Sequence, residues 1–329
     1  MTLNTLSNLS VVGIDVSKET LDVYHLPSKE YLKVKNNKDG FKELLPWLKK
    51  HEPDLVLCEN TGGYERKVIV ALTNASIPVC VANPTHIRYY AKSKGVFCKT
   101  DKTDAKIIAG FALERQPLPT RQPNENEMAL KEYVALRRQL IKERTALKNQ
   151  YEHAAQKETR KITKELINLI TKRIKKIETT IEKLIQENSE WSKRKKILQS
   201  IPGIGVDTVR TLQADMPELG EGSAEKISAL AGLAPQNKES GKWKGKAHIY
   251  GGRNTVRAAI HNAAMAAIYF TKDDNVFKQM YYHLTENLNK AHNVAVVAVA
   301  HKMLKIAHTL VKNGVEWENK LEKKSTSKQ

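Results

Sequence analysis

The sequence of 329 residues contains little cysteine and no long apolar run. Its cysteines, Cys58, Cys80 and Cys98, are scattered through the first third, a distribution that fits neither a disulfide framework nor a zinc site. No stretch of about 18 apolar residues is present, so we expect neither a membrane span nor a membrane partner. The N-terminal MTLNTLSNLS has no basic segment followed by an apolar one, and we expect no signal peptide. These features favour a protein of the reducing cytoplasm.

Acidic residues are also fewer than basic residues. The chain carries 55 Lys and Arg against 36 Asp and Glu, a formal net charge of +19. Such an excess favours a polyanionic partner, because neutralising phosphates releases counterions and long-range attraction speeds encounter. Nucleic acid is the leading candidate partner, ahead of an anionic membrane surface.

The first third alternates between strand and helix patterns. Short apolar or alternating runs predict strands, and longer amphipathic runs predict helices. The strands are expected at 11–16, 21–26, 31–35, 54–59 and 77–83, and the helices at 39–50, 64–75, 85–93 and 103–114. Three strands followed by alternating helices and strands predict a mixed sheet covered by helices.

A proline-rich segment at 116–123 predicts a linker, and long helices follow it. Apolar residues then recur at coiled-coil spacing, namely Leu166, Ile170, Ile174, Ile177, Ile181 and Leu184. Residues 121–200 hold 20 Lys and Arg and 11 Asp and Glu. The pattern fits a solvated helical hairpin or a dimerisation arm, and either could also bind nucleic acid along its basic face.

Beyond residue 197, short helical stretches are interrupted by glycine- and proline-containing turns. A segment rich in Gly and Lys spans 238–254, and apolar helices expected at 255–270 and near 290–312 are more typical of core than of a binding site. We expect the tail, 316–329, to be disordered because it is polar and charged.

Four acidic residues stand where a site is expected. Asp15 closes the first strand, Glu59 closes the fourth, and Asp101 and Asp104 lie three residues apart where a helix begins. An acid at the end of a buried strand is costly unless a cation or hydrogen bond compensates it. Four converging carboxylates could hold two hard divalent ions roughly 4 Å apart, as in enzymes that cleave phosphodiesters. The alternative is that each acid caps a helix or faces solvent.

Motifs along most of the chain resemble the DEDD transposases of the IS-one-ten family of bacterial insertion sequences, whose relatives include the pilin-inversion recombinases of the Piv type. The matching segments are GIDVSKETLDV (13–23), ENTGGYE (59–65), NPTHIRYYAKSKG (83–95), KTDKTDAKIIAGFA (99–112), IPGIG (201–205), GLAP (232–235), ESGKWKGK (239–246), GGRNTVRAAIHNAA (251–264) and KAHNVAVVAVAHKML (290–304). The element KTDxxDA, after a strand-borne Asp and Glu, is the most specific. One departure is Asn60, where the family more often has a small residue.

The resemblance implies an α/β RNase H-like domain of the RuvC type over 1–118. Its acidic tetrad would be Asp15, Glu59, Asp101 and Asp104, holding Mg²⁺ or Mn²⁺. A linker with coiled-coil helices would occupy 119–198, and a mainly α transposase domain 199–315. In that last domain the family's serine nucleophile falls on Ser240, next to Gly241.

The implied partners are the DNA of element ends and target, an element-encoded guide RNA, and further copies in a homodimer or homotetramer. The implied location is the bacterial cytoplasm, at the nucleoid.

Further residues are candidates for gripping nucleic acid. IPGIG resembles the hairpin of a helix-hairpin-helix unit, in which Gly203 and Gly205 would present backbone amides to a phosphate; an ordinary helix-breaking turn is the alternative. The lysines that follow Ser240 would neutralise a phosphate, while Arg253 and Arg257 could bind nucleic acid or pair with acids elsewhere. The lysines concerned are Lys242, Lys244 and Lys246.

Two other functions remain compatible with the sequence. A metal-dependent junction endonuclease that uses water as nucleophile would need the tetrad but not Ser240. A non-catalytic nucleic-acid-binding protein derived from a recombinase would need neither the tetrad nor Ser240. The intact tetrad argues against this alternative.

Overall fold

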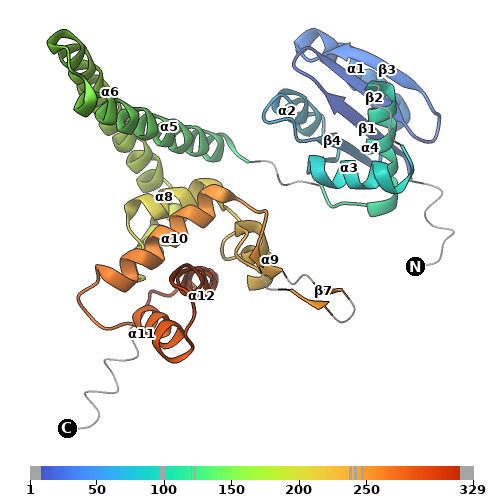
Figure 1. Ribbon diagram of the computed structural model, residues 1–329. Coiled ribbons are helices and arrows are strands. Elements are labelled where there is room, and N and C mark those ends of the chain that lie inside the picture. The colour runs from blue at the N-terminus through green and yellow to red at the C-terminus, as the bar shows by residue number, and fades with distance from the viewer. Residues whose placement is uncertain are drawn as a thin grey trace. The chain divides into compact units, whose positions relative to one another are not determined.

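The structure is a computed structural model that describes residues 9–96, 101–119, 121, 123–236, 239–240, 243–245 and 248–318. For Asp101, Glu239, Ser240, Trp243 and Lys244 it describes the backbone only. The chain divides into two compact units, residues 1–122 and 123–329 (Figure 1).

The first unit is built on a mixed five-stranded sheet. Its strands are β1 (Val11–Val16), β2 (Thr20–His25), β3 (Tyr31–Lys35), β4 (Leu55–Glu59) and β5 (Val79–Ala82), in the order β3-β2-β1-β4-β5. The first three strands form an antiparallel meander, and β4 and β5 run parallel to β1. The mixed sheet predicted from the alternation is thereby confirmed.

Helices cover both faces of this sheet. The helices are α1 (Lys38–His51), α2 (Arg66–Asn74), α3 (Pro84–Ser93) and α4 (Asp101–Arg115). Leu44 of α1 and Leu72 of α2 pack with Ile14 on one face. Ile87 of α3 and Ile108 of α4 pack on the other face. Because side chains alternate along a strand, the residues of β1 with odd numbers face α4.

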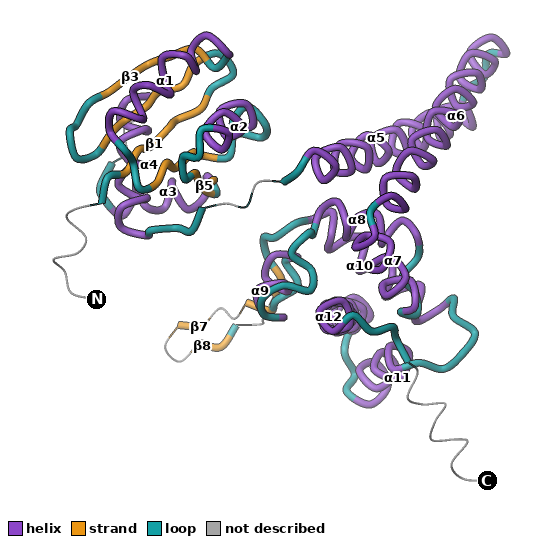
Figure 2. The backbone as a smooth tube through the Cα atoms, turned by 180° about the vertical axis from the view of Figure 1, so that it is seen from behind, coloured by secondary structure: helices purple, strands orange, loops and turns teal. Residues whose placement is uncertain are grey.

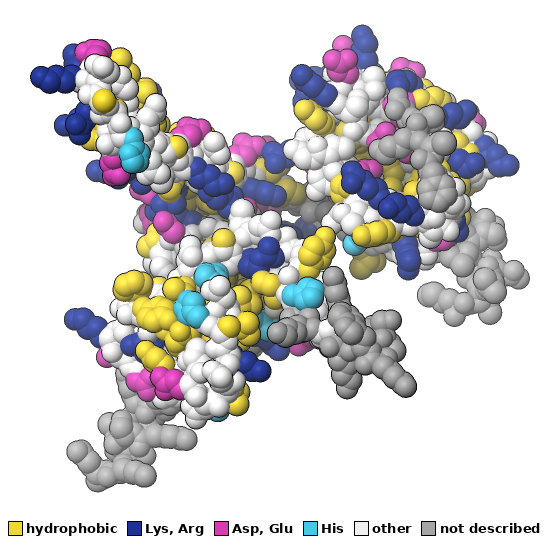
Figure 3. Space-filling view, in the orientation of Figure 1, with side chains coloured by type: hydrophobic (Ala, Val, Ile, Leu, Met, Phe, Trp, Pro, Cys, Tyr) yellow, Lys and Arg dark blue, Asp and Glu magenta, His cyan; other side chains and the backbone are white. Residues whose placement is uncertain are grey.

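The second unit begins with a long helical hairpin, which we call the arm. It consists of α5 (Glu125–His153) and α6 (Lys157–Glu187). The arm projects from the remaining helices of its unit (Figure 2). Near its base Ile181 and Ile185 of α6 pack on Leu130 and Val134 of α5. Farther out the heptad residue Leu166 is 43% exposed, and Lys and Arg side chains are spread over the arm surface (Figure 3).

Ion pairs attach the arm to the next helices, α7 (Ser189–Ser200) and α8 (Val206–Asp215). Arg137 of α5 contacts both Glu178 of α6 (2.7 Å) and Asp207 of α8 (2.8 Å). Arg138 pairs with Asp215 at 2.8 Å, and Lys195 of α7 pairs with Glu182. Because the Arg137 side chain is only 13% exposed, its pairs are less screened by solvent than surface pairs.

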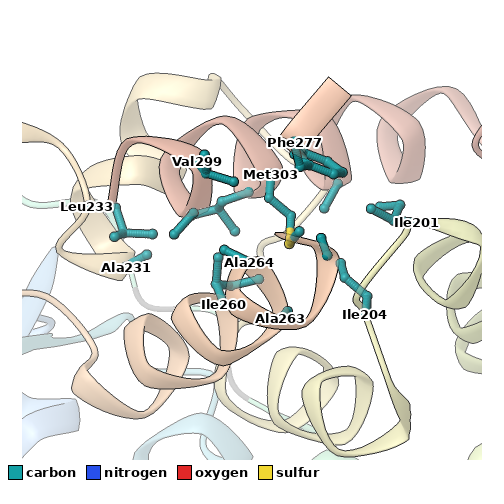
Figure 4. Packing of buried hydrophobic residues seen from close by; sticks show 14 of the residues in the cluster. Ile201, Ile204, Ala231, Leu233, Ile260, Ala263, Ala264, Phe277, Val299 and Met303 are labelled. Atoms are coloured by element: carbon teal, nitrogen blue, oxygen red, sulfur yellow. The ribbon is translucent and has the colours of Figure 1, made fainter. Parts of the chain in front are cut away.

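The rest of the second unit is a helical body with one large apolar core. Its helices are α9 (Ala224–Ala231), α10 (Asn254–Tyr269), α11 (Val276–Tyr282), the π-helical turn η2 (His283–Asn287) and α12 (His292–Asn313). Figure 4 shows Val299 and Met303 of α12 lying over Ile260 and Ala264 of α10. The small alanines of α10 let the two helices approach closely.

Helix α12 corrects the expectation that no stretch of the chain is long and apolar enough to span a membrane. By length and composition alone it is apolar enough to cross a membrane, with a mean hydropathy of 1.5. In the structure its Val296, Val299, Ala300 and Met303 are buried in the core of the helical body. The apolar character of α12 is thereby explained by packing within the protein.

Two short strand pairs precede α10. Strand β6 (Pro235–Gln236) pairs with β9 (His248–Ile249), and β7 (Glu239–Ser240) pairs with β8 (Trp243–Lys244). Both pairs are antiparallel. We call residues 235–249 the serine ribbon. Its outer pair lies beyond α9 in both backbone views.

Candidate functional site

Acidic residues form a row across the sheet of the first unit. Asp15 of β1 stands opposite Asp22 of β2 in the antiparallel register. On the other side, Ile14 pairs with Cys58 of the parallel strand β4, so the next residue of each strand is Asp15 and Glu59. Paired residues project from the same face of a sheet, with Cβ atoms about 5 Å apart across an antiparallel pair. The row therefore lies on the face that α4 covers.

Helix α4 crosses this face at very close range. Gly13 lies two residues before Asp15, and a Cβ atom added there would be 2.2 Å from the carbonyl oxygen of Ala105 and 2.4 Å from the nitrogen of Ala109. Only glycine allows two backbones to come so near. Gly13 thus sets the distance between the start of α4 and the acidic row.

The other two predicted acids belong to α4. Residues Ala105, Ile108, Ala109 and Ala112 are buried and mark the stripe of the helix that faces the sheet. Asp104 lies one turn before Ile108 on that stripe and is partly buried. Asp101 lies one turn before Ala105, and its side chain falls outside the described residues. Helical periodicity therefore places Asp104 on the sheet-facing stripe at the start of α4, where Asp101 is the first residue of the helix.

Asp22 is an acid of this row that the sequence analysis missed. Its side chain is buried, accepts a hydrogen bond from the Tyr31 hydroxyl and lies 3.3 Å from Nζ of Lys33. Lys33 is also its partner in the register of β2 and β3. The Lys102 ammonium of α4 stands 5.4 Å from the centre of the Tyr31 ring. The signal was present in the alternation of 21–26, which puts Asp22 and Tyr24 on one face.

The loop after Glu59 is held by a second buried acid. Glu65 accepts hydrogen bonds from the backbone of Thr61 (3.2 Å) and Gly63 (2.8 Å) and from the Thr61 hydroxyl (2.9 Å). Burial alone would raise the pKa of Glu65, but these hydrogen bonds outweigh it and hold the pKa below its usual range. Asn60 accepts from the Gly62 amide at 3.0 Å, which is the local contact this residue adds.

The chemistry of this row suits a hard cation. Its members offer carboxylate oxygens, and Asp15, Glu59 and Asp104 are each partly exposed. Among the side chains that the structure describes, which exclude Asp101, no group of three or more His, Cys, Asp or Glu is arranged to hold a metal. The four-residue metal site therefore stays a prediction.

The predicted nucleophile Ser240 lies in β7, where it pairs with Trp243 of the antiparallel strand β8. Its side chain, like that of Lys244, is outside what the structure describes, and Lys242 and Lys246 fall outside the described residues altogether. Two other nearby serines have structural partners. Ser223 caps α9 through the Lys226 amide, and buried Ser228 donates to the Ala224 carbonyl at 2.8 Å.

The two arginines predicted to grip nucleic acid have internal partners. Arg253 donates to both carboxylate oxygens of Glu218, at 2.6 and 2.7 Å, and to the Asp215 carbonyl at 2.9 Å. The hydrogen bonds with Glu218 raise the pKa of Arg253, and the geometry matches the pairing alternative. Arg257 donates to the Gly251 carbonyl at 2.6 Å and more weakly to Gly232, at 3.4 Å. It thereby joins the GLAP and GGRN motifs.

The two glycines of IPGIG have different surroundings. Gly203 has φ +86°, and an added Cβ would lie 2.2 Å from the carbonyl oxygen of Ala263 in α10. Gly205 has φ −87° and caps α8 with open space around it. Packing therefore explains the first glycine, whereas the second lies at the helix start where a phosphate contact is predicted.

We expect Gly203→Ala to lower the free energy of unfolding by roughly 2–4 kcal/mol, because both the left-handed backbone and the contact with α10 oppose a Cβ atom. Gly205→Ala is the matched control and should lower the free energy of unfolding by no more than about 1 kcal/mol, the usual cost of alanine at a helix N-cap. Denaturant unfolding of the full chain followed by tryptophan fluorescence measures both. Equal stability of the two variants would contradict this packing role.

The chain was compared with solved structures and with curated proteins. Two solved structures of Thermus thermophilus RuvC are similar to part of the chain at 18% identity. The complex with a Holliday junction substrate matches 33% of this chain and 96% of its own, with a TM-score of 0.27. The other covers 34% and 100%, with a TM-score of 0.28.

Curated relatives match over almost the whole length. The pilin gene-inverting proteins of Moraxella bovis and Moraxella lacunata are each 28% identical over 327 residues, covering 94% of this chain and 98% of the relative. Residues 12–158 match the profile of a DEDD transposase family, described as Transposase. Residues 195–282 match the profile described as Transposase IS116/IS110/IS902 family. The two profiles together span well over half of the sequence, and the chain belongs to this family of transposases.

Proposed function

We propose that this protein is a DNA transposase or site-specific recombinase that cuts DNA strands and rejoins them to new ends. The observation that carries the proposal is the acidic row on the α4 face, beside the two acids at the start of α4. Family membership supports it, because the matched profiles are those of transposases. The similar pilin gene-inverting proteins are named for a DNA rearrangement.

In this proposal Asp15, Glu59, Asp101 and Asp104 hold Mg²⁺ or Mn²⁺. Strand ends supply the first two carboxylates and the first turn of α4 supplies the others. When bound, such ions activate the attacking oxygen and neutralise charge on the leaving oxygen of a phosphodiester. Asp22 is the neighbour of Asp15 in the row, and Lys33 and Tyr31 hold its carboxylate there.

Ser240 supplies the second half of the chemistry. Its hydroxyl oxygen attacks the phosphorus of the strand, a new phosphate–serine ester forms, and the bond to one sugar oxygen breaks. The serine proton leaves as that sugar oxygen gains one. The number of phosphate esters is conserved, so the reverse attack by another sugar hydroxyl can reseal the strand without an external energy source.

The proposed partners follow from the charge and the arm. DNA is the substrate, and an RNA encoded by the same element chooses the sites. The net charge of +19 supports polyanionic partners. The exposed hydrophobic residues Ile162, Leu166 and Leu169 on the basic arm support assembly into dimers or tetramers. The protein would act at the nucleoid.

A metal-dependent endonuclease that uses water is the second candidate. One observation favours it: the acidic row lies wholly within the first compact unit, which does not contain Ser240. Such an enzyme would cut DNA without ever being linked to it.

One assay separates the two functions. The full-length protein is mixed with RNA transcribed from the flanks of its gene, DNA carrying joined element ends, and Mg²⁺. Denaturing gels then report cut strands, rejoined strands and protein-linked DNA. We expect rejoined strands and a linked species, both lost with a chelator and restored by added Mg²⁺. Cutting without rejoining or linkage would favour the endonuclease, and chelator-resistant products would contradict both.

A further inference from the structure

A cavity of about 400 Å³ lies in the helical body of the second unit. Its apolar walls are Leu233, Ile249 of β9 and Val297 of α12, and its polar side is formed by Arg257, His261 and Asn262 of α10. Cavities of this size bind small organic groups, with apolar walls for contact and a few polar groups for orientation.

The electrostatics of the cavity favour an anionic ligand. None of the described residues that line it is Asp or Glu. The guanidinium of Arg257 is held by neutral oxygens only, the carbonyls of Gly232 and Gly251 and the Asn254 amide. Its positive charge is thus fixed in place without an acidic partner among the described residues, which is the arrangement that attracts a phosphate.

Two further polar side chains line the cavity. Within the part of the chain that the structure describes, neither His261 nor Asn262 forms a side-chain hydrogen bond, although both line the cavity. An amide offers a donor and an acceptor side by side, and an imidazole can serve as either. These are the groups that hydrogen-bond to the edge of a nucleobase.

The cavity is also joined to the serine ribbon. Ile249 in its wall belongs to β9, which pairs with β6 at the base of that ribbon. Ser240 lies in the outer strand pair of the same ribbon, nine residues before Ile249. One wall of the cavity and the predicted nucleophile thus belong to the same short segment of the chain.

We propose that this cavity binds one unstacked nucleotide of the DNA strand on which Ser240 acts. The base enters between Leu233, Ile249 and Val297, with its edge toward His261 and Asn262, and the adjacent phosphate meets Arg257. Taking a base out of the stack is unfavourable, and contacts within a fitted pocket offset this cost. The inference rests on the proposed function, because it assumes that DNA is the substrate.

The test compares two probes that differ only in their bases. One is a short single strand of thymidine nucleotides, and the other is an abasic strand of the same length and phosphate number. Binding to the full-length protein is measured without RNA and without Mg²⁺, so no chemistry is needed. We expect the thymidine strand to bind at least about fivefold more tightly, since a stacked base contributes on the order of 1 kcal/mol or more.

The decisive variant fills the cavity. Ala258 lines it and is exposed on α10, so Ala258→Phe occupies the space without disturbing the core. The matched control is Ala146→Phe, at an exposed position of α5. We expect Ala258→Phe to abolish the preference for the thymidine strand while leaving abasic binding unchanged, and Ala146→Phe to keep the preference. Circular dichroism confirms that both variants fold.

A second pair of variants tests the polar groups. The double change His261→Ala with Asn262→Ala should reduce the preference, whereas His153→Ala at the exposed end of α5 should not. Absence of any preference in the wild type, or its survival in Ala258→Phe, would overturn the proposal. Failure of the proposed function and failure of the proposed nucleotide site give different results. If Ala258→Phe removes the preference but the assay above shows no recombination, only the proposed function is rejected. If recombination occurs but Ala258→Phe keeps the preference, only the proposed nucleotide site is rejected.

Discussion

Replacing Asp15 by asparagine is expected to lower the rate of DNA cleavage by at least about three powers of ten, because a bound metal contributes several kcal/mol and each 1.4 kcal/mol is tenfold. Asparagine keeps the size of the side chain and removes its charge. Asp15 lies between Asp22 and Glu59 in the acidic row, so its loss should weaken metal binding most directly. Cleavage rates are measured over a range of Mg²⁺ concentrations, where the variant should also need more metal.

The control for this change is Asp39→Asn. Asp39 is an exposed acid in the first turn of α1 whose partner is Lys42 at 2.9 Å, and its variant should cleave at the wild-type rate. Asp22→Asn should have an intermediate effect, because Asp22 already has Lys33 and Tyr31 as partners. Wild-type cleavage by Asp15→Asn, with unchanged metal dependence, would rule out the proposed metal site.

The second large effect is expected for Ser240→Ala, which should eliminate the protein-linked DNA seen with the wild type. Alanine removes the hydroxyl that forms the phosphate ester and keeps the short strand β7. Without that ester the strand cannot be resealed, so recombination should fall below detection. DNA binding should survive, since the basic residues are untouched. Denaturing gels measure linkage, and a filter or gel-shift assay measures binding.

Ser189→Ala is a suitable control, because Ser189 is an exposed serine at the start of α7. It should form linked DNA like the wild type. Linked DNA in Ser240→Ala would show that another residue is the nucleophile. Cleavage without linkage in both proteins would instead favour the water-using endonuclease and withdraw the role of the serine ribbon.

Much of the fold could be predicted because its elements have strong local patterns. The apolar run of β1, the period-two runs of β2 and β3 and the acids at the ends of β1 and β4 are visible in consecutive residues. Asp101 and Asp104 could be assigned to the first turn of a helix because they lie three residues apart at its expected start. These features depend on residues within one or two turns of each other.

The features that could not be predicted from the sequence depend on contacts between distant segments. The role of Asp22 required the register of β1 with β2 and of β2 with β3, which sequence spacing leaves open. The need for glycine at position 13 is visible only once α4 lies on β1. Likewise, the sequence could not choose between nucleic acid and an internal acid for Arg253, since Glu218 lies 35 residues away.

The ion pairs at the foot of the arm have a mechanical consequence. Arg137 and Arg138 tie α5 to α8, so the arm cannot swing without breaking buried or half-buried charge pairs. With 31 residues in α6 and a rise of 1.5 Å per residue, the arm is a lever of about 46 Å. A rotation of one degree at its foot would move the tip by roughly 0.8 Å over that length. A partner that grips the tip thus has the leverage to set the orientation of the helical body, including the ribbon that carries Ser240.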